Sequence, residues 1–472
     1  MAVPSLPHQT PQDPDADCVW QQGKIVEVAI ADLSDRGDGV GRYQERVVFV
    51  PNTVPGDRLL ARLIRVKPRY AHGQLHTLLE ASPHRVQPSC IVADKCGGCQ
   101  LQTLSYPQQL AAKENKITQA LAKLGGFSEP PIAPILAAPS SLGYRNKATY
   151  PLGRSTTGQV QAGYYRKGSH RLVNLNQCPV QDPRLNSFLS EIKQTIQQQG
   201  WSIYNESSHR GNLRHLGLRI GRRTGEVLLT LVGRESFSAD IEEQAALWLD
   251  RYPELVGVVW NHNPERTNTI FGSTSHCLAG RPYLEETFAG LTFRIDATSF
   301  FQIYTEQAEL LLRTILSHLN LQGTEFLVDA YCGIGTLTLP LAKHSQHVLG
   351  IELQPEAIAL GRTNASLNGL TNITFQAGAV AAVLEQLTGH PDIVLLDPPR
   401  RGCDRAVIHQ LQRLSPPHII YVSCKPATLA RDLQLLAQAG YQLTKVQPAD
   451  FFPQTAHVEA VAFLSKTGGL SS

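Results

Sequence analysis

IVLLDPPRRG (residues 393–402) and IIYVSCKPAT (residues 419–428) are two short segments in which an apolar run ends at a reactive side chain. The first run ends at Asp397 and the second at Ser423-Cys424. Short apolar runs rich in β-branched residues and bounded by Pro or Gly are typical of buried parallel strands. The ligand crevice of an open α/β sheet lies at the carboxyl ends of its strands. We therefore expect Asp397 and Cys424 to share one pocket, which Glu459 can reach from the last loop, DFFPQTAHVE (residues 450–459).

Cys424 can be interpreted either as a small core hydrophobe or as a nucleophile. Cysteine is among the most buried residue types, so the first interpretation is the common one. Cys424, however, follows a predicted strand, precedes Lys425-Pro426 and faces the predicted crevice. Nearby cations and the amides at the start of a helix favour a thiolate. The position therefore favours a nucleophile.

The composition of the whole chain restricts the classes of function. A length of 472 residues predicts two to four domains with sizeable cores. The net charge is only +3, so binding to nucleic acid would have to come from local basic patches. No apolar run approaches the length of a membrane span, and residues 1–19 are expected to form a disordered tail. Nine cysteines without an export signal favour a reducing, cytoplasmic location.

The sequence from residue 291 onward alternates strand-like and helix-like runs. Strand 326–329 leads into a turn that carries Gly333 and Gly335, and helix 337–342 follows. The next strand, residues 348–352, ends in Glu352, about 20 residues after the glycines. This order is typical of the nucleotide-binding half of a doubly wound α/β fold, in which the acid lies near ribose hydroxyls.

Residues 20–80 contain short strand-like runs punctuated by glycine and proline. The runs cover residues 24–28, 47–50 and 59–64, and this spacing favours a small OB-like β-barrel. Basic residues gather near the end of the unit, with only Asp57 opposing them: Arg58, Arg62, Arg65, Lys67 and Arg69. They can form a solvated strand face or contact the backbone of RNA.

Three cysteines lie close together after this unit. Five residues separate Cys90 from Cys96, and Gly97-Gly98 separate Cys96 from Cys99. Clustered cysteines in a reducing compartment favour a metal site, and an all-cysteine site needs a fourth ligand. The candidates for that ligand are Cys178 and, less favoured, Cys277. The spacing alone admits zinc or an iron–sulfur cluster.

The central region, residues 81–290, begins with a predicted helix over residues 105–125 and then alternates strand-like runs with loops. Tyrosines are interleaved there with basic residues: Tyr144, Tyr150, Tyr164 and Tyr165 with Arg145, Lys147, Arg154, Arg166, Lys167 and Arg171. Arginine and tyrosine together suit stacking and phosphate contacts on unpaired RNA. The alternative is that the charges serve solubility.

The motifs resemble those of the RNA 5-methyluridine methyltransferase family. Residues 397–402 match the family pattern Asp-Pro-Pro/Ala-Arg-x-Gly, and residues 450–459 match Asp-x-Phe-Pro-Gln-Thr-x-His-x-Glu. Residues 421–428 match Tyr-x-Ser-Cys-Asn-x-x-Thr, with Lys425 in place of Asn. Residues 329–335 resemble motif I of S-adenosylmethionine-dependent methyltransferases, and residues 300–302 resemble the family's Phe-x-Gln, with Tyr304 where the family usually has Asn.

This resemblance implies an activity and a set of roles. The enzyme would transfer a methyl group from S-adenosyl-L-methionine to C5 of a uridine, which must leave its stack to be reached. Cys424 would add to C6, and Glu459 would remove the C5 proton. The cofactor would be bound by Gln302, Tyr331, Glu352 and Asp397, and a contact at Ala379 would come from its backbone.

The cysteine run and the N-terminal unit resemble the iron–sulfur 23S rRNA branch of the family. That branch implies a [4Fe-4S] cluster held by Cys90, Cys96, Cys99 and Cys178. It also implies three domains: a TRAM barrel over residues 20–80, a central α+β RNA-binding domain with the cluster over 81–290, and a Rossmann-like methyltransferase domain over 291–472. The expected partner is 23S rRNA, with no membrane involved and the chain monomeric.

Three alternatives differ from this interpretation. The tRNA branch of the same family typically lacks the N-terminal barrel and the cysteine run. An RNA cytosine C5 methyltransferase would use a different motif with a second cysteine. A non-catalytic iron–sulfur RNA-binding protein would have no need for Asp397, Cys424 and Glu459 together.

Overall fold

The structure is a computed structural model that describes residues 20–466, and the tail predicted over residues 1–19 lies outside them. The described chain divides into two compact units. The first contains the residues up to Asp94 together with Cys99–Gln109 and Gln454–Ala456. The second contains Lys95–Gly98, Leu110–Pro453 and the residues from His457 onward. Among the helices described, none combines the length and the apolar character needed to cross a membrane.

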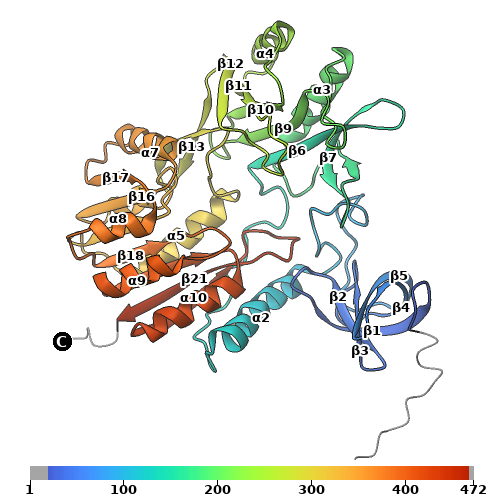
Figure 1. Ribbon diagram of the computed structural model, residues 1–472, viewed down its shortest axis with the longest axis horizontal. Coiled ribbons are helices and arrows are strands. Elements are labelled where there is room, and N and C mark those ends of the chain that lie inside the picture. Colours follow the sequence, from blue (N-terminus) through green and yellow to red (C-terminus); the bar gives the residue numbers. More distant parts are fainter. Residues whose placement is uncertain (1–19, 467–472) are drawn as a thin grey trace, which may run out of the picture. The chain divides into compact units, whose positions relative to one another are not determined.

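The first unit contains a closed five-stranded barrel, drawn in blue in Figure 1. Around the barrel the strands follow the order β1-β2-β3-β5-β4, with bounds β1 Ile25–Leu33, β2 Gly39–Tyr43, β3 Arg46–Val50, β4 Arg58–Val66 and β5 Tyr70–Glu80. Alternate residues of β1 and β4 point inward, so that Val26, Val28, Leu59 and Leu63 are buried in one core. This period of two closes the sheet around its apolar face, and the predicted small barrel is confirmed.

Acidic residues lie closer to the basic residues of the barrel than the sequence suggests. Asp57 is buried and binds Arg85, so it does not oppose the basic cluster. Arg58 instead pairs with Glu27 at 2.8 Å and with Glu80 at 2.6 Å. These two acids belong to β1 and β5, the strands on either side of β4. The expectation that only Asp57 opposes the cluster is therefore wrong, because cross-strand register brings in acids that are distant in sequence.

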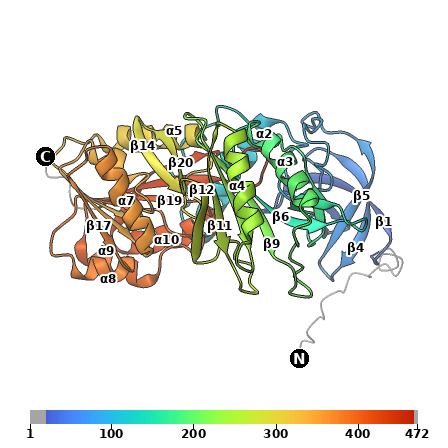
Figure 2. The same cartoon turned by 90° about the horizontal axis from the view of Figure 1, so that it is seen from above.

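The second unit contains two seven-stranded sheets. The first has the order β12-β11-β10-β9-β6-β7-β8. Helices α3 (Leu185–Gln198) and α4 (Ala239–Arg251) contact its strands, as Figure 2 shows. The strands are β6 Lys147–Arg154, β7 Val160–Tyr165, β8 Leu172–Asn174, β9 Leu213–Ile220, β10 Val227–Gly233, β11 Leu255–His262 and β12 Thr274–Gly280. A hairpin of β13 (Tyr283–Phe288) and β14 (Leu291–Asp296) follows.

The second sheet has the order β17-β16-β15-β18-β19-β21-β20. Its strands are β15 Phe326–Ala330, β16 His347–Glu352, β17 Ile373–Ala377, β18 Ile393–Leu396, β19 His418–Ser423, β20 Tyr441–Ala449 and β21 Glu459–Lys466. The first five are parallel, and β21 is antiparallel to both of its neighbours. All four residues of β18 are buried, as expected of a strand covered on both faces.

Helices cover both faces of this sheet, as in a doubly wound fold, and Figure 2 shows α5 and α8 on opposite sides. One core joins residues of α2, α8, α9 and α10 with alternate residues of the central strands. The helices are α2 Tyr106–Gly125, α5 Thr305–Leu319, α6 Thr338–Ala342, α7 Pro355–Leu367, α8 Val380–Gln386, α9 Arg405–Leu414 and α10 Pro426–Gln438. The helix predicted over 105–125 and the strands predicted around Asp397 and Cys424 differ from these bounds by one residue at most.

Candidate active site

Three predicted residues lie at one edge of the second sheet. Asp397 follows β18 and Cys424 follows β19, and these two strands are parallel neighbours. Glu459 is the first residue of β21, whose next residue, Ala460, pairs with Ser423. Glu459 therefore lies opposite Cys424, although 35 positions separate them in the numbering of the chain. The edge thus combines a thiol with two carboxyl groups, which is a set of side chains suited to addition and proton transfer.

The thiol of Cys424 is surrounded by acids and by one cation. Burial raises its pKa, as do the neighbouring carboxylates of Glu459 and Asp397, whereas the guanidinium of Arg400 lowers it. The net effect is an increase, so the position does not favour the thiolate that the sequence suggests. The reason is that desolvation and two acids outweigh one exposed cation. Arg400 belongs to the DPPRRG motif, but the motif by itself does not reveal that its guanidinium lies beside the thiol.

Arg400 is held next to the last loop. Its Nη2 atom lies 3.1 Å from Nδ1 of His457. Burial and the surrounding cations, Arg400 first among them, lower the pKa of His457 to about 4, so this ring is neutral and can accept a hydrogen bond from the guanidinium. The carbonyl of Arg400 accepts a hydrogen bond from Thr428 on α10 at 3.4 Å. These contacts keep the guanidinium beside the thiol.

Glu459 and Asp397 are both stabilised in their protonated forms. Burial raises the pKa of Glu459 to about 8, with a further contribution from Asp397, and burial raises that of Asp397 to about 7. Glu459 is 7% exposed, and its Oε2 atom has no hydrogen-bond partner among the described residues. A carboxyl group with a pKa near neutrality can both accept and release a proton at physiological pH, as a general base requires.

This raised pKa predicts a stability difference for Glu459→Gln in the cofactor-free protein. The folded pKa of about 8 exceeds the ordinary value of 4.5, so the folded state binds more protons and wild-type stability falls as pH rises between these values. Glutamine resembles the protonated carboxyl group but does not titrate, so the stability of the variant does not fall in this way as pH rises. We expect thermal unfolding to show equal stability near pH 4 and a more stable variant near pH 8.5, by on the order of 1 kcal/mol per unit of pKa shift. A constant difference across this range would contradict the assignment.

The turn after β15 forms a second part of the site. Asp329 is buried, its Oδ2 accepts a hydrogen bond from Thr338 at 2.6 Å, and its Oδ1 has no partner among the described residues. Burial raises the pKa of Asp329 to about 7, and the nearby carboxylates of Asp397 and Glu352 add to this increase. Glu352 accepts a hydrogen bond from the amide of Gly333 at 3.3 Å. The acids at the ends of β15, β16 and β18 therefore lie close together.

These acids fit S-adenosylmethionine in charge and in chemistry. Its sulfonium and amino groups are cations, and the neighbouring carboxyl groups of Asp329, Glu352 and Asp397 offer oxygen atoms that can face them. A bound cation would favour the ionised forms of Asp329 and Asp397, whose pKa values burial raises. Gly335 has a φ of +88°, and a Cβ placed on it would lie 2.4 Å from Leu339, so only glycine fits there. The turn thereby brings backbone amides close to the space beyond the strand ends, as nucleotide-binding turns do.

The other two predicted cofactor residues are placed differently. Tyr331 has a φ of +71°, and its hydroxyl is directed to Sγ of Cys403 at 4.0 Å, so its ring turns toward the core of the sheet. Gln302 is buried on the loop before α5, where Asn146 donates to its carbonyl at 2.8 Å. Arg219 supports this loop by donating to the carbonyl of Ser299 at 2.7 Å. These two hydrogen bonds hold the loop that contains Gln302 against the first seven-stranded sheet, because Asn146 directly precedes β6 and Arg219 lies on β9.

The structure places the two residues that differ from the family pattern. Tyr304 is buried, stacks on Tyr144 with ring centroids 4.8 Å apart, and its hydroxyl donates to Ser140 at 2.9 Å. Tyr304 thus fills the core instead of facing the cofactor side. Lys425 is exposed at the N-cap of α10 and makes no side-chain capping bond.

A buried ion pair anchors the loop that leads to Glu459. Lys113 on α2 lies 2.6 Å from Asp450 and also donates to the carbonyl of Phe452 at 3.0 Å. Both side chains are at most 1% exposed. Burial lowers the pKa of Lys113, while Asp450 opposes that decrease. Asp450 belongs to the quoted motif, but a single lysine in a helical pattern does not reveal its partner.

Lys113→Met is expected to destabilise the second unit by about 3–5 kcal/mol, because it leaves a carboxylate buried without its cation. Methionine keeps the length of the side chain, so lost packing contributes little. Lys113→Met combined with Asp450→Asn removes both charges and should recover part of the loss. Lys123→Met on the exposed face of the same helix is the control and should stay within about 0.5 kcal/mol. Equal urea midpoints for Lys113→Met and Lys123→Met would contradict this role.

The predicted cluster ligands are divided between the two units. Cys90 and Cys99 belong to the first unit, and Cys96 and Cys178 to the second. Cys96, Cys90 and Cys99 are half-buried and Cys178 is buried. The Sγ atom of Cys96 accepts the amide of Gly98 at 3.4 Å, a kind of bond that tunes cluster thiolates. Within residues 20–466, no three side chains of His, Cys, Asp or Glu are arranged to hold a metal ion.

The chain matches two family models. The model described as tRNA (Uracil-5-)-methyltransferase matches residues 286–467, and the model of the TRAM domain matches residues 19–76. An uncharacterized RNA methyltransferase of Nostoc sp. (strain PCC 7120) is 63% identical over 446 residues, which cover 94% of this chain and 97% of the relative. An uncharacterized RNA methyltransferase of Synechocystis sp. (strain PCC 6803) is 54% identical, covering 96% of this chain and 98% of the relative.

A solved structure resembles nearly the whole chain. The tRNA (uracil-54, C5)-methyltransferase of Pyrococcus abyssi, in complex with S-adenosyl-L-homocysteine, has 29% sequence identity and a TM-score of 0.76. The match covers 93% of this chain and 99% of the Pyrococcus chain. Sequence, fold and relatives thus agree with the resemblance read from the motifs, and the expected TRAM domain is confirmed. The chain belongs to the RNA (uracil-5-)-methyltransferase family.

Proposed function

We propose that the protein transfers a methyl group from S-adenosyl-L-methionine to C5 of a uridine in 23S rRNA, through a covalent bond between Cys424 and C6. The observation that carries this proposal is the position of Glu459 opposite Cys424 at the edge where Asp397 also lies. A nucleophile and a base on opposite sides of one base ring are what addition and later elimination require.

The first step is the addition of the sulfur of Cys424 to C6. Burial and the neighbouring acids favour the thiol form of Cys424. Its proton passes to solvent, which reaches this half-buried side chain, as the S–C6 bond forms. The guanidinium of Arg400 stabilises the developing thiolate. The electron pair of the C5–C6 double bond moves to form an enolate, which makes C5 a nucleophile. The target uridine must be turned out of its stack to reach this edge of the sheet.

The second step places the methyl group on C5. When it is bound, S-adenosylmethionine would supply an electrophilic methyl group on a sulfonium, whose S–CH₃ bond breaks to leave a neutral thioether. The acids Asp329, Glu352 and Asp397 would hold this cation, with Gln302 and the glycine turn positioning the rest of the molecule. The bound sulfonium would in turn favour the ionised form of these carboxyl groups.

The last step removes the C5 proton. Glu459 in its ionised form takes that proton, the C5–C6 double bond re-forms, and the S–C6 bond breaks to release the thiolate. The raised pKa of Glu459 makes it a stronger base than an ordinary glutamate.

A tRNA uracil-C5 methyltransferase is the second candidate, and a specific observation favours it. The Pyrococcus abyssi protein whose name gives tRNA uracil-54 as its target matches 93% of this chain. The presence of an N-terminal barrel therefore does not by itself separate the two branches. The resemblance of the cysteine run to the 23S rRNA branch remains the argument for rRNA.

A methyl-transfer assay separates the candidates. Purified protein and labelled S-adenosylmethionine are mixed with 23S rRNA or tRNA from cells that lack the protein, and 5-methyluridine is mapped in the product. Label in 23S rRNA alone supports the proposal, and label in tRNA alone supports the second candidate. Absence of label in both would overturn uracil-C5 methylation as the function.

We also propose that Cys90, Cys96, Cys99 and Cys178 hold a [4Fe-4S] cluster with a structural or RNA-positioning role. Support comes from the sequence spacing, from the all-sulfur donor set and from the amide bond to Cys96. A redox-neutral methyl transfer needs no electron carrier, so none of the steps above involves the cluster.

Protein purified without oxygen is expected to be brown, with about four irons per chain, as a cubane held by four thiolates requires. Cys178→Ala should lose this iron. Cys277→Ala is the matched control, because Cys277 is exposed on β12, and it should keep the iron. Stoichiometric zinc without iron would show that the site exists but holds another metal.

A further inference from the structure

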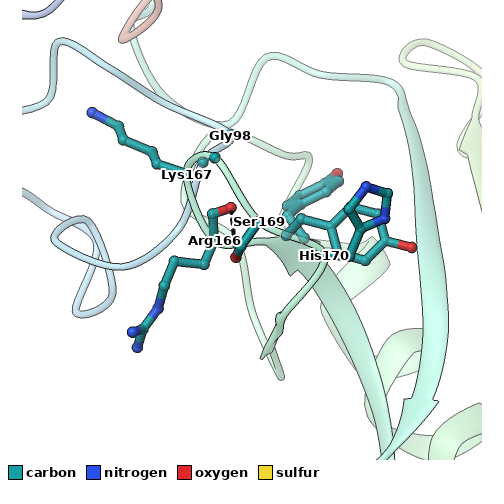
Figure 3. Close-up of a pocket in the computed structure, with 9 residues that line it drawn as sticks. Gly98, Arg166, Lys167, Ser169 and His170 are labelled. Carbon is teal, nitrogen blue, oxygen red and sulfur yellow. Dashed lines mark hydrogen bonds between the residues drawn. The ribbon is translucent and has the colours of Figure 1, made fainter. Parts of the chain in front are cut away.

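A cavity of about 530 Å³ lies at the tip of the β7–β8 hairpin, outside the candidate active site. The residues that line it are Gly97, Gly98, Tyr164, Tyr165, Arg166, Lys167, Gly168, Ser169 and His170. Figure 3 shows Arg166 and Lys167 extending to one side of the hairpin tip and His170 standing on the other. The cavity therefore has a cationic end and an aromatic end.

The hairpin tip is held rigidly by its own backbone. Tyr165 pairs with Leu172 at the end of the two strands, and the amide of Arg166 donates to the carbonyl of Arg171 at 2.8 Å. The amide of Gly97 donates to the carbonyl of Tyr165 at 2.9 Å. A Cβ on Gly97 would lie 2.8 Å from that same carbonyl oxygen, so glycine is required for this approach. The cavity is thus preformed in the structure.

The aromatic end presents two neighbouring rings, tilted by 45° relative to each other. The rings of Tyr165 and His170 have centroids 5.3 Å apart, and the exposed carboxylate of Glu206 lies 3.4 Å from Nδ1 of His170. Behind them, the ring of Tyr164 packs on Tyr150 at 5.3 Å, and its hydroxyl accepts a hydrogen bond from Gln181 at 2.6 Å. These contacts restrain the rings, which lowers the entropy lost when a ligand stacks on them.

The two ends match the two parts of a nucleotide. Aromatic faces stack on any base and are worth about 1–3 kcal/mol per base in single-stranded complexes. Arginine and lysine bind the phosphate, whereas Glu206 at the aromatic end would repel it. This separation of charge therefore also sets the direction of the nucleotide. A paired base would not expose its face to the rings, so the ligand must be unpaired.

We propose that this cavity binds one unpaired nucleotide of the RNA substrate, with its base on Tyr165 and His170 and its phosphate at Arg166 and Lys167. The inference rests on the proposed function for the identity of the macromolecule. It adds an RNA contact away from the methylated uridine, on the loop that contains Cys96. Loss of the cluster would then weaken RNA binding through this loop without altering the catalytic edge.

The first test measures binding of the full-length protein by fluorescence anisotropy. The probe is a labelled single-stranded RNA of about 12 nucleotides and mixed sequence, within the range of known single-strand site sizes. Tyr165→Leu keeps bulk but removes the stacking face, and it should weaken binding by about 5- to 150-fold. Tyr165→Phe keeps the ring and should bind like the wild type. The same RNA annealed to its complement should show little difference between the variants.

The second test examines the cationic end. Arg166→Ala combined with Lys167→Ala should weaken binding and reduce its dependence on salt, since two phosphate contacts are removed. Arg313→Ala is the matched control: it removes an exposed arginine from α5, far from the cavity in sequence, and should leave both quantities unchanged. A probe containing 4-thiouridine should photocrosslink wild-type protein within the peptide of residues 164–170, a result that needs no variant to fold.

The outcomes distinguish this inference from the proposed function. If the wild type methylates RNA and Tyr165→Leu raises KM with kcat unchanged, the inference holds. If the wild type methylates RNA but Tyr165→Leu binds normally and no crosslink falls at residues 164–170, the cavity is not an RNA site and the proposed function stands. If no RNA is methylated but the variants still weaken binding, the cavity stands and the proposed function falls.

Discussion

Glu459→Gln is expected to accumulate a covalent protein–RNA adduct that carries the labelled methyl group and survives denaturing gel electrophoresis. Glutamine keeps the size of the side chain but cannot accept the C5 proton, so addition and methylation proceed while elimination stalls. Multiple turnover should fall by about 10²- to 10⁴-fold, the range for a positioned general base. The position of Glu459 opposite Cys424, rather than its sequence motif alone, is what makes this adduct the expected product.

The pH dependence of the adduct provides a control. In the wild type, the ionised form of Glu459 increases as pH rises toward its pKa of about 8, so elimination should accelerate over that range. The variant has no such group, and the lifetime of its adduct should vary little with pH. Normal turnover by Glu459→Gln, or an adduct without the methyl label, would assign the base to another residue.

Cys424→Ala is expected to bind RNA and S-adenosylmethionine but to form no adduct and transfer no methyl group. The loss in turnover should exceed about 10⁴-fold, as when a catalytic nucleophile is removed, because C5 of uracil alone is too weak a nucleophile. RNA that contains 5-fluorouridine should trap the wild type, because fluorine cannot leave as a cation, and should not trap the variant.

Three other cysteines serve as controls for this experiment. Cys332 and Cys403 are buried near the site, and burial raises the pKa of both thiols above that of a free cysteine. Both thiols are buried, whereas Cys424 is half-buried and lies beside the guanidinium of Arg400, so Cys332→Ala and Cys403→Ala should still form the adduct. Cys277→Ala should do the same, since Cys277 is exposed on the first sheet of its unit. An adduct formed by Cys424→Ala and lost in Cys332→Ala or Cys403→Ala would move the nucleophile to that residue.

Local sequence patterns predict the strands that position the site, but they do not predict the pKa of its side chains. The apolar runs before Asp397 and Cys424 predict β18 and β19 almost to the residue, because burial on both faces requires continuous apolar sequence. The local sequence around Cys424 also predicts a stabilised thiolate. That interpretation was wrong, because the pKa depends on Glu459 and on burial, which a local pattern does not encode.

The sequence by itself determined that buried strands end next to Asp397 and Cys424, that a glycine turn precedes Glu352, and that cysteines cluster at residues 90–99. These features depend on residue type and short spacing, which the backbone periodicities convert directly into structure. Only the tertiary structure decided the register of β21 that places Glu459 opposite Cys424, and the pairing of Lys113 with Asp450 across 337 positions. It likewise decided that Gly97 packs against Tyr165 to shape the hairpin cavity. These contacts join segments that are far apart in the sequence. Which buried polar groups meet and satisfy one another is set by the packing of whole helices and strands, and no single segment encodes it.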